Sequence, residues 1–299
     1  CPLRCVWCNN PESWSERPQK IYKKNKCIRC GSCVEVCPQG AIVLTQEGIM
    51  PVQGVQCLQC GRCVEVCPTT ALEMCGRAYT MDELMLEIEK ERDIMQDSGG
   101  GVTLCGGEPL KDSPKTVSSS TQGRGEEDVV GLLKELGRRG FHRAVDTTLY
   151  VHDTDFLMQV ADECELFLVD LKLMDSARHK QLTGVGNEQI LENLRRICDY
   201  GTDIWIRVPL IEGVNTDEDN IKKTAKFVAS LYVASGCSRG KGVQQVNLLP
   251  YHDVGKDKHR RLWSTYNPQH LPMMAPSDET LQRCVQLFED YGIKTIVGG

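Results

Sequence analysis

Short apolar runs and amphipathic segments follow one another along residues 79–299, and this alternation predicts the fold class. An apolar run between turn residues predicts a strand, whereas apolar residues at every third or fourth position predict a helix. Strands and helices in alternation favour an α/β fold with a parallel sheet, curved into a barrel or part of one. The expected strands are residues 102–105, 144–148, 166–173, 204–209, 243–250 and 293–297, and the expected helices are residues 80–97, 128–139, 153–163, 187–200, 217–231 and 277–291.

Three segments carry signals of their own. Thr80 and Glu83 form a capping box that starts the first helix, and residues 99–101 are glycines that end it. Residues 111–127 are hydrophilic with three serines in a row, so we expect a mobile surface loop there. Residues 13–26 are polar, rich in lysine and contain a proline, which is typical of a connector.

A cysteine-rich block precedes these elements and contains an internal duplication. Residues 27–38 read CIRCGSCVEVCP, and residues 57–68 read CLQCGRCVEVCP. Each half has the spacing of a bacterial ferredoxin, in which the fourth cysteine binds the cluster of the other half. A pair of four-cysteine zinc sites is the alternative, but it leaves the duplication unexplained. The sequence therefore predicts two 4Fe-4S clusters, one held by Cys27, Cys30, Cys33 and Cys67 and the other by Cys57, Cys60, Cys63 and Cys37.

The chain opens with three more cysteines, Cys1, Cys5 and Cys8, in a CxxxCxxC run. Soft thiolates at this spacing select zinc or an iron-sulfur cluster. The next residues, 9–12, supply no cysteine or histidine that would complete a zinc site, so a cluster with one open iron is favoured. A zinc loop or three reduced structural thiols is the alternative.

Composition narrows the class and the location. The chain has 299 residues, 40% of them hydrophobic and 25% charged, which suits one or two globular domains. A net charge of -6 argues against nucleic-acid binding, and neither a membrane-length apolar run nor a signal peptide is visible. Eleven of the 17 cysteines lie in residues 1–67 in CxxC-type runs, which favours metal ligands in a reducing cytoplasm. We expect Cys75, Cys164, Cys198, Cys237 and Cys284 to be buried apolar thiols.

Polar residues follow the apolar strands, where a barrel carries its functional groups. Glycines allow close backbone approach, carboxylates can accept from an ammonium, and lysine or arginine can meet a carboxylate. Each residue also has a structural explanation: an ion pair for Asp170 and Lys172, a turn for the glycines, or a satisfied surface histidine. The candidate residues are Gly106, Gly107, Glu108, Asp146, Thr147, Asp170, Lys172, Arg207 and His252.

The CxxxCxxC run, with Trp7 before its third cysteine, resembles the signature of the radical S-adenosylmethionine enzymes. The whole set of motifs resembles the glycyl-radical enzyme activating enzymes over nearly the whole chain. The likeness is greater to the subgroup with two extra clusters, which serves glycerol or diol dehydratases, choline lyase and arylacetate decarboxylases, than to the activator of pyruvate formate-lyase. The motifs are the cysteine run, the eight-cysteine block, Gly106-Gly107-Glu108-Pro109, Asp146-Thr147, Asp170-Leu171-Lys172, Arg207-Val208-Pro209 and Leu249-Pro250-Tyr251-His252.

The resemblance implies a fold and a set of domains. The fold is a partial (β/α)6 TIM-like barrel with an inserted ferredoxin-like α+β domain. Residues 1–20 would start the radical S-adenosylmethionine core, residues 21–78 would be the insert with two clusters, and residues 79–299 would complete the barrel. The strand that normally precedes the first cysteine is missing from this chain, and the chain does not begin with methionine, so we expect it to be part of a longer protein.

The resemblance also assigns roles to the candidate residues. Cys1, Cys5 and Cys8 would hold a third 4Fe-4S cluster, whose open iron is chelated by the amino and carboxylate groups of S-adenosylmethionine. The segment from Gly106 to Glu108 would contact the methionine amino group, and the motif residues Leu171 and Arg207 would belong to the same site. The carboxylate would lie near Lys172, Asp146, Thr147 and Asp170, and the nucleoside near His252, Trp7, Cys8 and Asn9. The resemblance leaves room for a monovalent cation near Asp146 and Asp170.

The implied activity is that of a radical oxidoreductase. A flavodoxin or ferredoxin would supply electrons, which the two ferredoxin clusters relay to the cluster of Cys1, Cys5 and Cys8. S-adenosylmethionine would then be cleaved to a 5'-deoxyadenosyl radical that abstracts hydrogen from a backbone glycine of a partner glycyl-radical enzyme. Glycine suits this role because it lacks a side chain. The alternatives are a ferredoxin-type electron carrier, which leaves the first three cysteines without a task, and a radical enzyme acting on another peptide or a small molecule.

Two further features depart from the family pattern. Cys105 stands where serine usually precedes Gly-Gly-Glu, and a thiol there could quench a radical unless it points away. Residues 111–127 replace a short link and could alter docking of the partner.

Overall fold

The computed structural model describes residues 1–15, 17–111, 129–234 and 242–298. Their chain forms two compact units. The first, which we call the sheet unit, comprises residues 1–5, 79–252 and 270–299, and the second, which we call the repeat unit, comprises residues 6–78 and 253–269. The predicted loop at 111–127 lies almost wholly outside the described residues, as does Cys237. No helix in the described ranges is long and apolar enough to cross a membrane.

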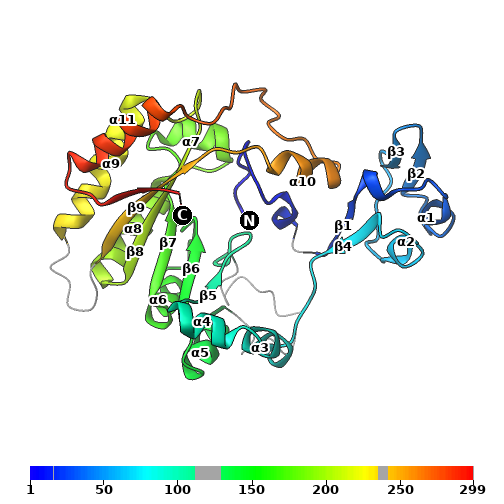
Figure 1. Cartoon of the computed structure of the whole chain (residues 1–299), viewed down its shortest axis with the longest axis horizontal. Helices are drawn as coiled ribbons and strands as arrows, with labels where there is room; N and C mark the ends of the chain where they lie inside the picture. Colours follow the sequence, from blue (N-terminus) through cyan, green and yellow to red (C-terminus); the bar gives the residue numbers. More distant parts are fainter. Residues whose placement is uncertain (16, 112–128, 235–241, 299) are drawn as a thin grey trace. The chain divides into compact units, whose positions relative to one another are not determined.

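The sheet unit is built on a six-stranded sheet in which every neighbouring pair of strands is parallel. The spatial order of the strands follows their order in the chain (Figure 1). Parallel strands bring all their carboxyl ends to the same edge, so the residues that follow them gather there. The strands are β5 (Gly101–Leu104), β6 (His142–Thr147), β7 (Leu166–Asp170), β8 (Asp203–Leu210), β9 (Val243–Pro250) and β10 (Thr295–Val297).

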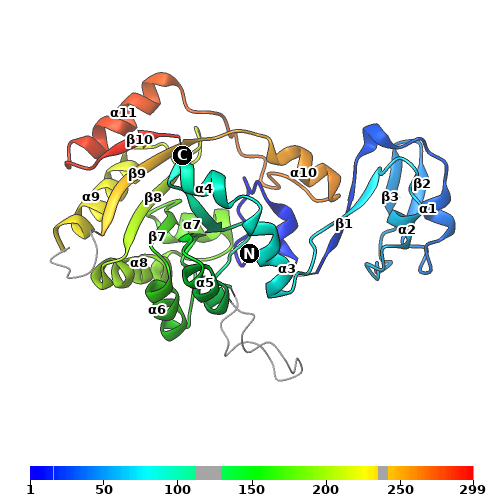
Figure 2. The same ribbon diagram turned by 60° about the horizontal axis from the view of Figure 1, so that its bottom comes forward.

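Five helices connect or follow these strands and form one layer against the sheet (Figures 1 and 2). Each helix contacts the next one along the chain. Asp153 and Ser277 cap two of them by accepting hydrogen bonds from the backbone N–H groups of Phe156 and Thr280. The helices are α5 (Val129–Arg138), α6 (Thr154–Glu163), α8 (Glu188–Tyr200), α9 (Glu218–Ala234) and α11 (Asp278–Glu289). The α/β class with a parallel sheet is therefore confirmed.

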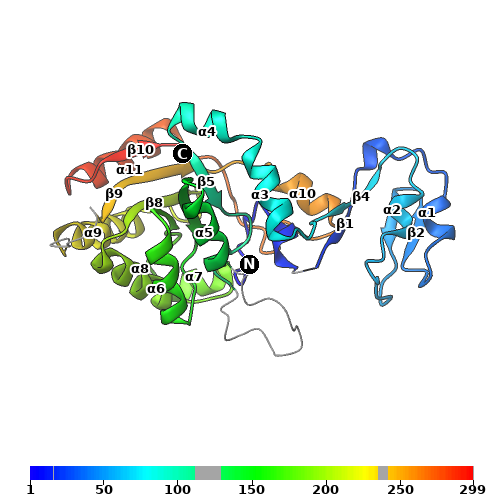
Figure 3. The ribbon, with the colours of Figure 1, turned by 90° about the horizontal axis from the view of Figure 1, so that it is seen from below.

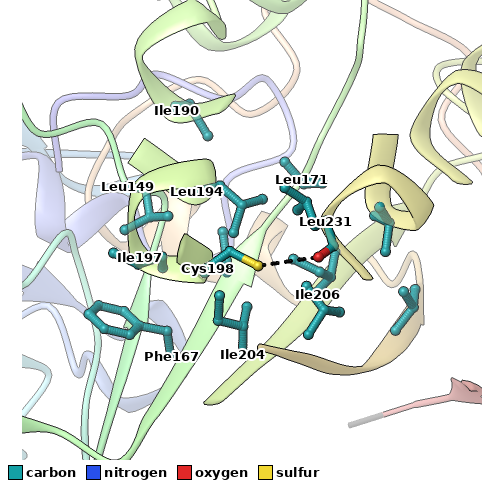
Figure 4. Close-up of a cluster of buried hydrophobic side chains, with 14 of the residues drawn as sticks. Leu149, Phe167, Leu171, Ile190, Leu194, Ile197, Cys198, Ile204, Ile206 and Leu231 are labelled. Carbon is teal, nitrogen blue, oxygen red and sulfur yellow. Dashed lines mark hydrogen bonds between the residues drawn. The ribbon is translucent and has the colours of Figure 1, made fainter. Parts of the chain in front are cut away.

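The main core lies between this helical layer and the sheet. Figure 4 shows Phe167, Ile204 and Ile206 from the strands beside Leu194 and Ile197 from α8. All five side chains are almost completely buried, so each removes its full apolar surface from water. Cys198 lies among them with its Sγ 3.6 Å from the Leu231 carbonyl oxygen.

Four of the five cysteines expected to be buried are described. Cys164, Cys198 and Cys284 are buried as predicted, and burial raises the pKa of the Cys164 thiol to about 12 and that of Cys284 to about 11. Cys75 is only half-buried, because it ends strand β4 (Leu72–Cys75), so that prediction was wrong.

The helix expected at 80–97 is divided into α3 (Met81–Glu89) and α4 (Arg92–Ser98). The predicted capping box is present, and Gly99 ends α4 in a left-handed conformation. The division lets Met85 of α3 and Met95 of α4 pack on the same small cluster around Leu136. Strand β7 ends three residues before the expected boundary, and the polar helix α7 (Ser176–Thr183) was not predicted.

The repeat unit reflects the duplication in its secondary structure (Figure 3). Strand β2 (Ile42–Thr45) and helix α1 (Ser32–Glu35) recur thirty positions later as β4 and α2 (Arg62–Glu65). β1 (Gln19–Tyr22) pairs antiparallel with β4, and β3 (Gly48–Pro51) pairs antiparallel with β2. The interpretation of residues 13–26 as a connector was therefore wrong, because they contain β1, the 3-10 helix Lys24–Lys26 and the end of the 3-10 helix Pro11–Trp14.

Residues 253–269 belong to the repeat unit although they lie far along the chain. They contain α10 (Gly255–Arg261), which the sequence did not predict. Trp263 stacks on Tyr22 with ring centroids 5.7 Å apart, and its Nε1 donates to the Ile49 carbonyl oxygen at 3.1 Å. An aromatic stack and a hydrogen bond thus fix this late segment to both two-stranded sheets of the repeat unit.

Candidate functional site

Four charged residues form a network at the carboxyl edge of the sheet. Asp170 ends β7 and lies in register with Arg207 of β8. Its Oδ2 accepts from Lys172 Nζ at 2.6 Å, while its Oδ1 lies 3.9 Å from Arg207 Nε. Arg207 also donates to Asp146 of β6. The charges of the network therefore alternate in the order Asp146, Arg207, Asp170 and Lys172, as expected for charged groups that are partly removed from water.

The electrostatics of this network keep Lys172 charged. Burial acts to lower the pKa of Lys172, but the negative charges of Asp170 and Cys5 raise it above its usual value. The Lys172 side chain is only 8% exposed, so its ammonium is a concentrated charge with little water around it. Burial and the neighbouring Asp170 raise the pKa of Asp146, and Arg207 opposes that rise. Such a buried cation can bind a carboxylate.

Glu108 follows β5 and is already engaged by its neighbours. Its two carboxylate oxygens accept from Thr147 Oγ1 and Thr148 Oγ1, both at 2.5 Å, and from the N–H groups of Thr148 and Leu110 at 2.8 and 3.2 Å. Burial raises the pKa of Glu108, while these donors favour its charged form. Glu108 thus joins the turn after β5 to the end of β6. The sequence predicted Glu108 and Thr147 as site residues but not Thr148. The pair of threonines at the end of a predicted strand was the only feature that pointed to it.

Of the two glycines before Glu108, Gly106 is exposed at this edge and Gly107 is half-buried. Gly106 has φ 110°, a conformation that favours glycine, and a Cβ there would meet no atom within 4 Å. Cys105 is exposed and directly follows β5, at the same edge of the sheet. His252, which follows β9, is also exposed.

The segment that follows Cys5 belongs to the repeat unit and packs on α10. Trp7 is buried, and a Cβ on Gly255 would lie 2.5 Å from Asn9 Oδ1 and 2.9 Å from the Cys8 carbonyl oxygen. Only glycine permits this approach of helix and loop. Asn9 Oδ1 is buried and has no hydrogen-bond partner among the described residues, so it can accept from a bound group.

His259 of α10 is the buried histidine beside this loop, and the sequence gave no local signal for it. Its Nε2 lies 3.1 Å from the Cys8 carbonyl oxygen and therefore donates to it, so Nδ1 accepts from the Ser264 hydroxyl at 2.9 Å. Trp14 and Tyr266 meet the ring edge-on, with centroids 5.3 and 5.2 Å away. Burial lowers the pKa of His259, which favours this neutral form.

The eight cysteines of the repeat line two pockets, and each pocket draws on both halves. The first is lined by Cys37 together with Cys57, Cys60 and Cys63. The second is lined by Cys67 together with Cys27, Cys30 and Cys33. The described residues contain no group of three or more His, Cys, Asp or Glu arranged for a single metal ion. Four thiols around a pocket of this kind suit a multi-iron cluster, in which each thiolate binds a different iron.

Backbone and hydroxyl donors point at some of these thiols. The Ala41 N–H donates to Cys37 Sγ at 3.2 Å, and Ser32 Oγ donates to Cys30 Sγ at 3.5 Å. The Ser32 donors lower the pKa of Cys30. For Cys37, burial acts to raise the pKa, but the backbone N–H groups of Ala41 and Gln39 lower it overall. Thiolates stabilised in this way are suitable cluster ligands.

Each of the two units resembles known proteins. Residues 26–71 match the family model of the 4Fe-4S dicluster domain. A domain of a pyruvate-formate lyase-activating enzyme from Bacteroides vulgatus superimposes with a TM-score of 0.50 and 40% identity, covering 67% of this chain and 100% of that chain. The parallel α/β unit therefore has the radical S-adenosylmethionine fold.

Several relatives match this chain along nearly all of its length. The trans-4-hydroxy-L-proline dehydratase activating enzyme of Clostridioides difficile is 38% identical over 100% of this chain and 91% of its own. The choline trimethylamine-lyase activating enzyme of Oleidesulfovibrio alaskensis is 37% identical over 97% of this chain and 88% of its own. The chain belongs to the family of glycyl-radical enzyme activating enzymes, as its motifs predicted.

Proposed function

We propose that this chain installs a glycyl radical on a partner dehydratase, lyase or decarboxylase. The observation that carries the proposal is Lys172, a buried ammonium kept charged by Asp170 and within electrostatic range of Cys5. Such a group suits a substrate carboxylate bound beside a cysteine-held cluster. When bound, a 4Fe-4S cluster and S-adenosylmethionine supply one-electron reductive cleavage to a 5'-deoxyadenosyl radical. The protein supplies binding, orientation and exclusion of water.

We assign the cluster with the open iron to Cys1, Cys5 and Cys8. Cys5 acts on the pKa of Lys172, which supports a cluster ligand next to a carboxylate site. Asp170 and Arg207 hold Lys172 and Asp146 in their charge states and orient them. A monovalent cation near Asp146 and Asp170 would compete with Arg207 and Lys172, which already neutralise these carboxylates.

The two ends of S-adenosylmethionine are assigned to different residues. For the methionine amino group we assign the backbone of Gly106 and Gly107, with Glu108 holding their turn through Thr147 and Thr148. For the nucleoside we assign Trp7, Cys8 and Asn9, because the buried Asn9 Oδ1 can accept from a hydroxyl or amino group. His259 acts as a positioning residue for the Cys8 backbone. Leu171, which lies between Asp170 and Lys172, and the exposed His252 complete the proposed site.

We further infer that the eight repeat cysteines hold two 4Fe-4S clusters with crossed ligands. The composition of the two pockets supports this assignment. These clusters receive electrons from a flavodoxin or ferredoxin and relay them to the third cluster. The six strands lie side by side in chain order, and the helices between them form one layer. This arrangement supports a partial (β/α)6 barrel, into which residues 21–78 are inserted. We expect the protein to work in the cytoplasm.

The relay is tested by replacing Cys57 and Cys60 together with alanine. We expect the iron content to fall by one cluster and the glycyl-radical signal to fall when flavodoxin is the reductant, because the relay is interrupted. Dithionite, which can reduce the remaining cluster directly, should restore much of the yield. The matched control is Cys75→Ala, which changes a cysteine of the same unit outside the eight ligands.

The assay is anaerobic and uses a glycyl-radical enzyme encoded beside this gene as substrate. Electron paramagnetic resonance measures the glycyl radical, and chromatography measures 5'-deoxyadenosine. An unchanged radical yield with flavodoxin in the double variant would refute the relay. Absence of 5'-deoxyadenosine from the fully reconstituted protein would refute the proposed activity itself.

A further inference from the structure

At one structurally equivalent position, the two halves of the repeat face different residues on their paired strands. Met74 of β4 faces Lys20 in register, whereas Leu44, the equivalent residue of β2, faces Ile49. Lys20 lines the pocket of Cys37, Cys57, Cys60 and Cys63, and Ile49 lines the other pocket. The duplication therefore places a cation beside one set of thiols and a buried alkyl group beside the other.

The Lys20 ammonium is directed at the thiols. Its Nζ lies 3.6 Å from Cys57 Sγ, and its charge acts on Cys37 and Cys63. The same ammonium lies 5.8 Å from the centre of the Trp263 ring, a cation–π distance that limits its movement. Lys20 is half-buried, so water screens this charge only in part.

The other pocket has a neutral group in the corresponding region. The Tyr22 hydroxyl accepts from the Ile49 N–H at 3.3 Å, and burial is the main cause that raises the pKa of Tyr22, with Cys27 adding to it. Tyr22 therefore stays a neutral phenol. Each pocket is also lined by one arginine, Arg62 in the first and Arg29 in the second, so the arginines do not distinguish the pockets. Arg29 donates instead to the carbonyl oxygens of Thr45 and Gln46.

We propose that Lys20 raises the reduction potential of the cluster held by Cys37, Cys57, Cys60 and Cys63 above that of its twin. This inference rests on the proposed clusters. An iron-sulfur cluster gains one negative charge when it accepts one electron, and a nearby cation stabilises that reduced form. A single electron that enters the repeat unit therefore resides mainly on the cluster beside Lys20. Lys20 thus determines which of the two clusters is reduced first.

The test is a potentiometric titration of the reconstituted protein, followed by electron paramagnetic resonance. In Lys20→Met, which keeps the apolar stem but removes the charge, we expect the reduced fraction of one ferredoxin cluster to fall at a fixed potential. The expected change is roughly tenfold in the ratio of reduced to oxidised cluster, as for one partly screened unit charge at this distance. Tenfold corresponds to about 59 mV for a one-electron couple. The other ferredoxin cluster should keep its potential.

Two further variants separate charge from structure. Lys20→Arg should retain the wild-type potential, and Lys20→Gln provides a second neutral side chain should the methionine variant fail to bind iron. The control is Lys24→Met, which removes a more exposed lysine of the same unit that pairs with Glu47. That variant should leave both potentials unchanged.

The possible failures are distinguishable. Potentials that stay the same in both neutral variants, with full iron content, would overturn the role of Lys20 and leave the clusters intact. A wild-type protein that binds no iron at the eight repeat cysteines would instead overturn the proposed function. Equal shifts in Lys20→Met and Lys24→Met would show an effect of net charge alone and would also overturn the inference.

Discussion

At the scale of single residues, the site depends on charges that neutralise one another. Asp170 and Lys172 are close in sequence, so their pairing could be predicted from the strand-end pattern. Arg207 and Asp146 lie on other strands, and only the register of the sheet brings them into the same network. The sequence analysis did not identify His259 or Thr148 for a related reason. His259 contacts Cys8 and Thr148 contacts Glu108, and both partners are distant along the chain.

Replacing Lys172 by methionine should remove both a stabilising charge and the carboxylate-binding group. Asp170 then loses the closer of its two cations and keeps only Arg207 at 3.9 Å. We therefore expect the unfolding free energy to fall by about 1.5–3 kcal/mol, the usual value of a hydrogen bond to a charged group. Binding of S-adenosylmethionine, measured by its effect on the cluster spectrum, should weaken strongly. Lys180→Met, at an exposed position of helix α7, is the control and should change neither quantity. Normal binding in the Lys172 variant would contradict the assigned role.

At the scale of elements, acidic and basic side chains connect α3, α4 and the end of α5. Glu89 ends α3 and accepts from Arg92 of α4 at 2.5 and 2.8 Å, and Arg139, which follows α5, donates to it at 3.3 Å. The hydrogen bond from Arg92, followed by that from Arg139, lowers the pKa of Glu89 to about 2. The sequence predicted one helix here, because periodicity does not reveal that Met85 and Met95 share an apolar cluster.

This lowered pKa predicts how the Glu89 contribution depends on pH. A carboxyl group whose pKa is lower in the folded state stabilises the fold above the unfolded pKa, about 4.3 for glutamate. The contribution is lost as pH falls from that value through about 2. Thermal unfolding of the wild type and of Glu89→Gln should therefore differ by a constant amount from pH 8 to about 5 and converge only at lower pH. A difference that already disappears between pH 8 and 6 would contradict this account.

At the scale of the whole molecule, the chain visits the repeat unit twice. The cysteine spacing alone predicted the two crossed sets of thiols, because ferredoxin ligands are close in sequence within each half. The return of residues 253–269 to this unit was not predictable, since it depends on Trp263 reaching Tyr22 and Ile49, more than two hundred positions away. The parallel sheet was predictable, because apolar runs and amphipathic helices alternate throughout residues 129–298.

Trp263→Ala should loosen residues 253–269 from the repeat unit. Truncating a fully buried tryptophan lowers the free energy of unfolding by ~3–5 kcal/mol. Because Trp263 is only half-buried, we expect a decrease of about half that amount. Hydrogen exchange should become faster in β1, β3 and α10 but stay unchanged in β6 to β9. Trp205→Ala, the same substitution on a 36% exposed residue of β8, is the control and should have no effect on the repeat unit. Faster exchange throughout both units would show that the substitution acts globally.

The exchange of fourth cysteines between the halves of the repeat has a consequence for biosynthesis. Cys37 lines the pocket of residues 57–63, and Cys67 lines the pocket of residues 27–33. A nascent chain that has emerged from the ribosome only as far as residue 56 therefore contains no complete set of four ligands for either pocket. With the proposed ligand sets, the pocket of Cys37 has its four thiols only once Cys63 has emerged, and the other pocket only once Cys67 has emerged. Iron delivery to either centre therefore waits for the second half of the repeat, and a translation product truncated before Cys63 should leave the ribosome without either centre.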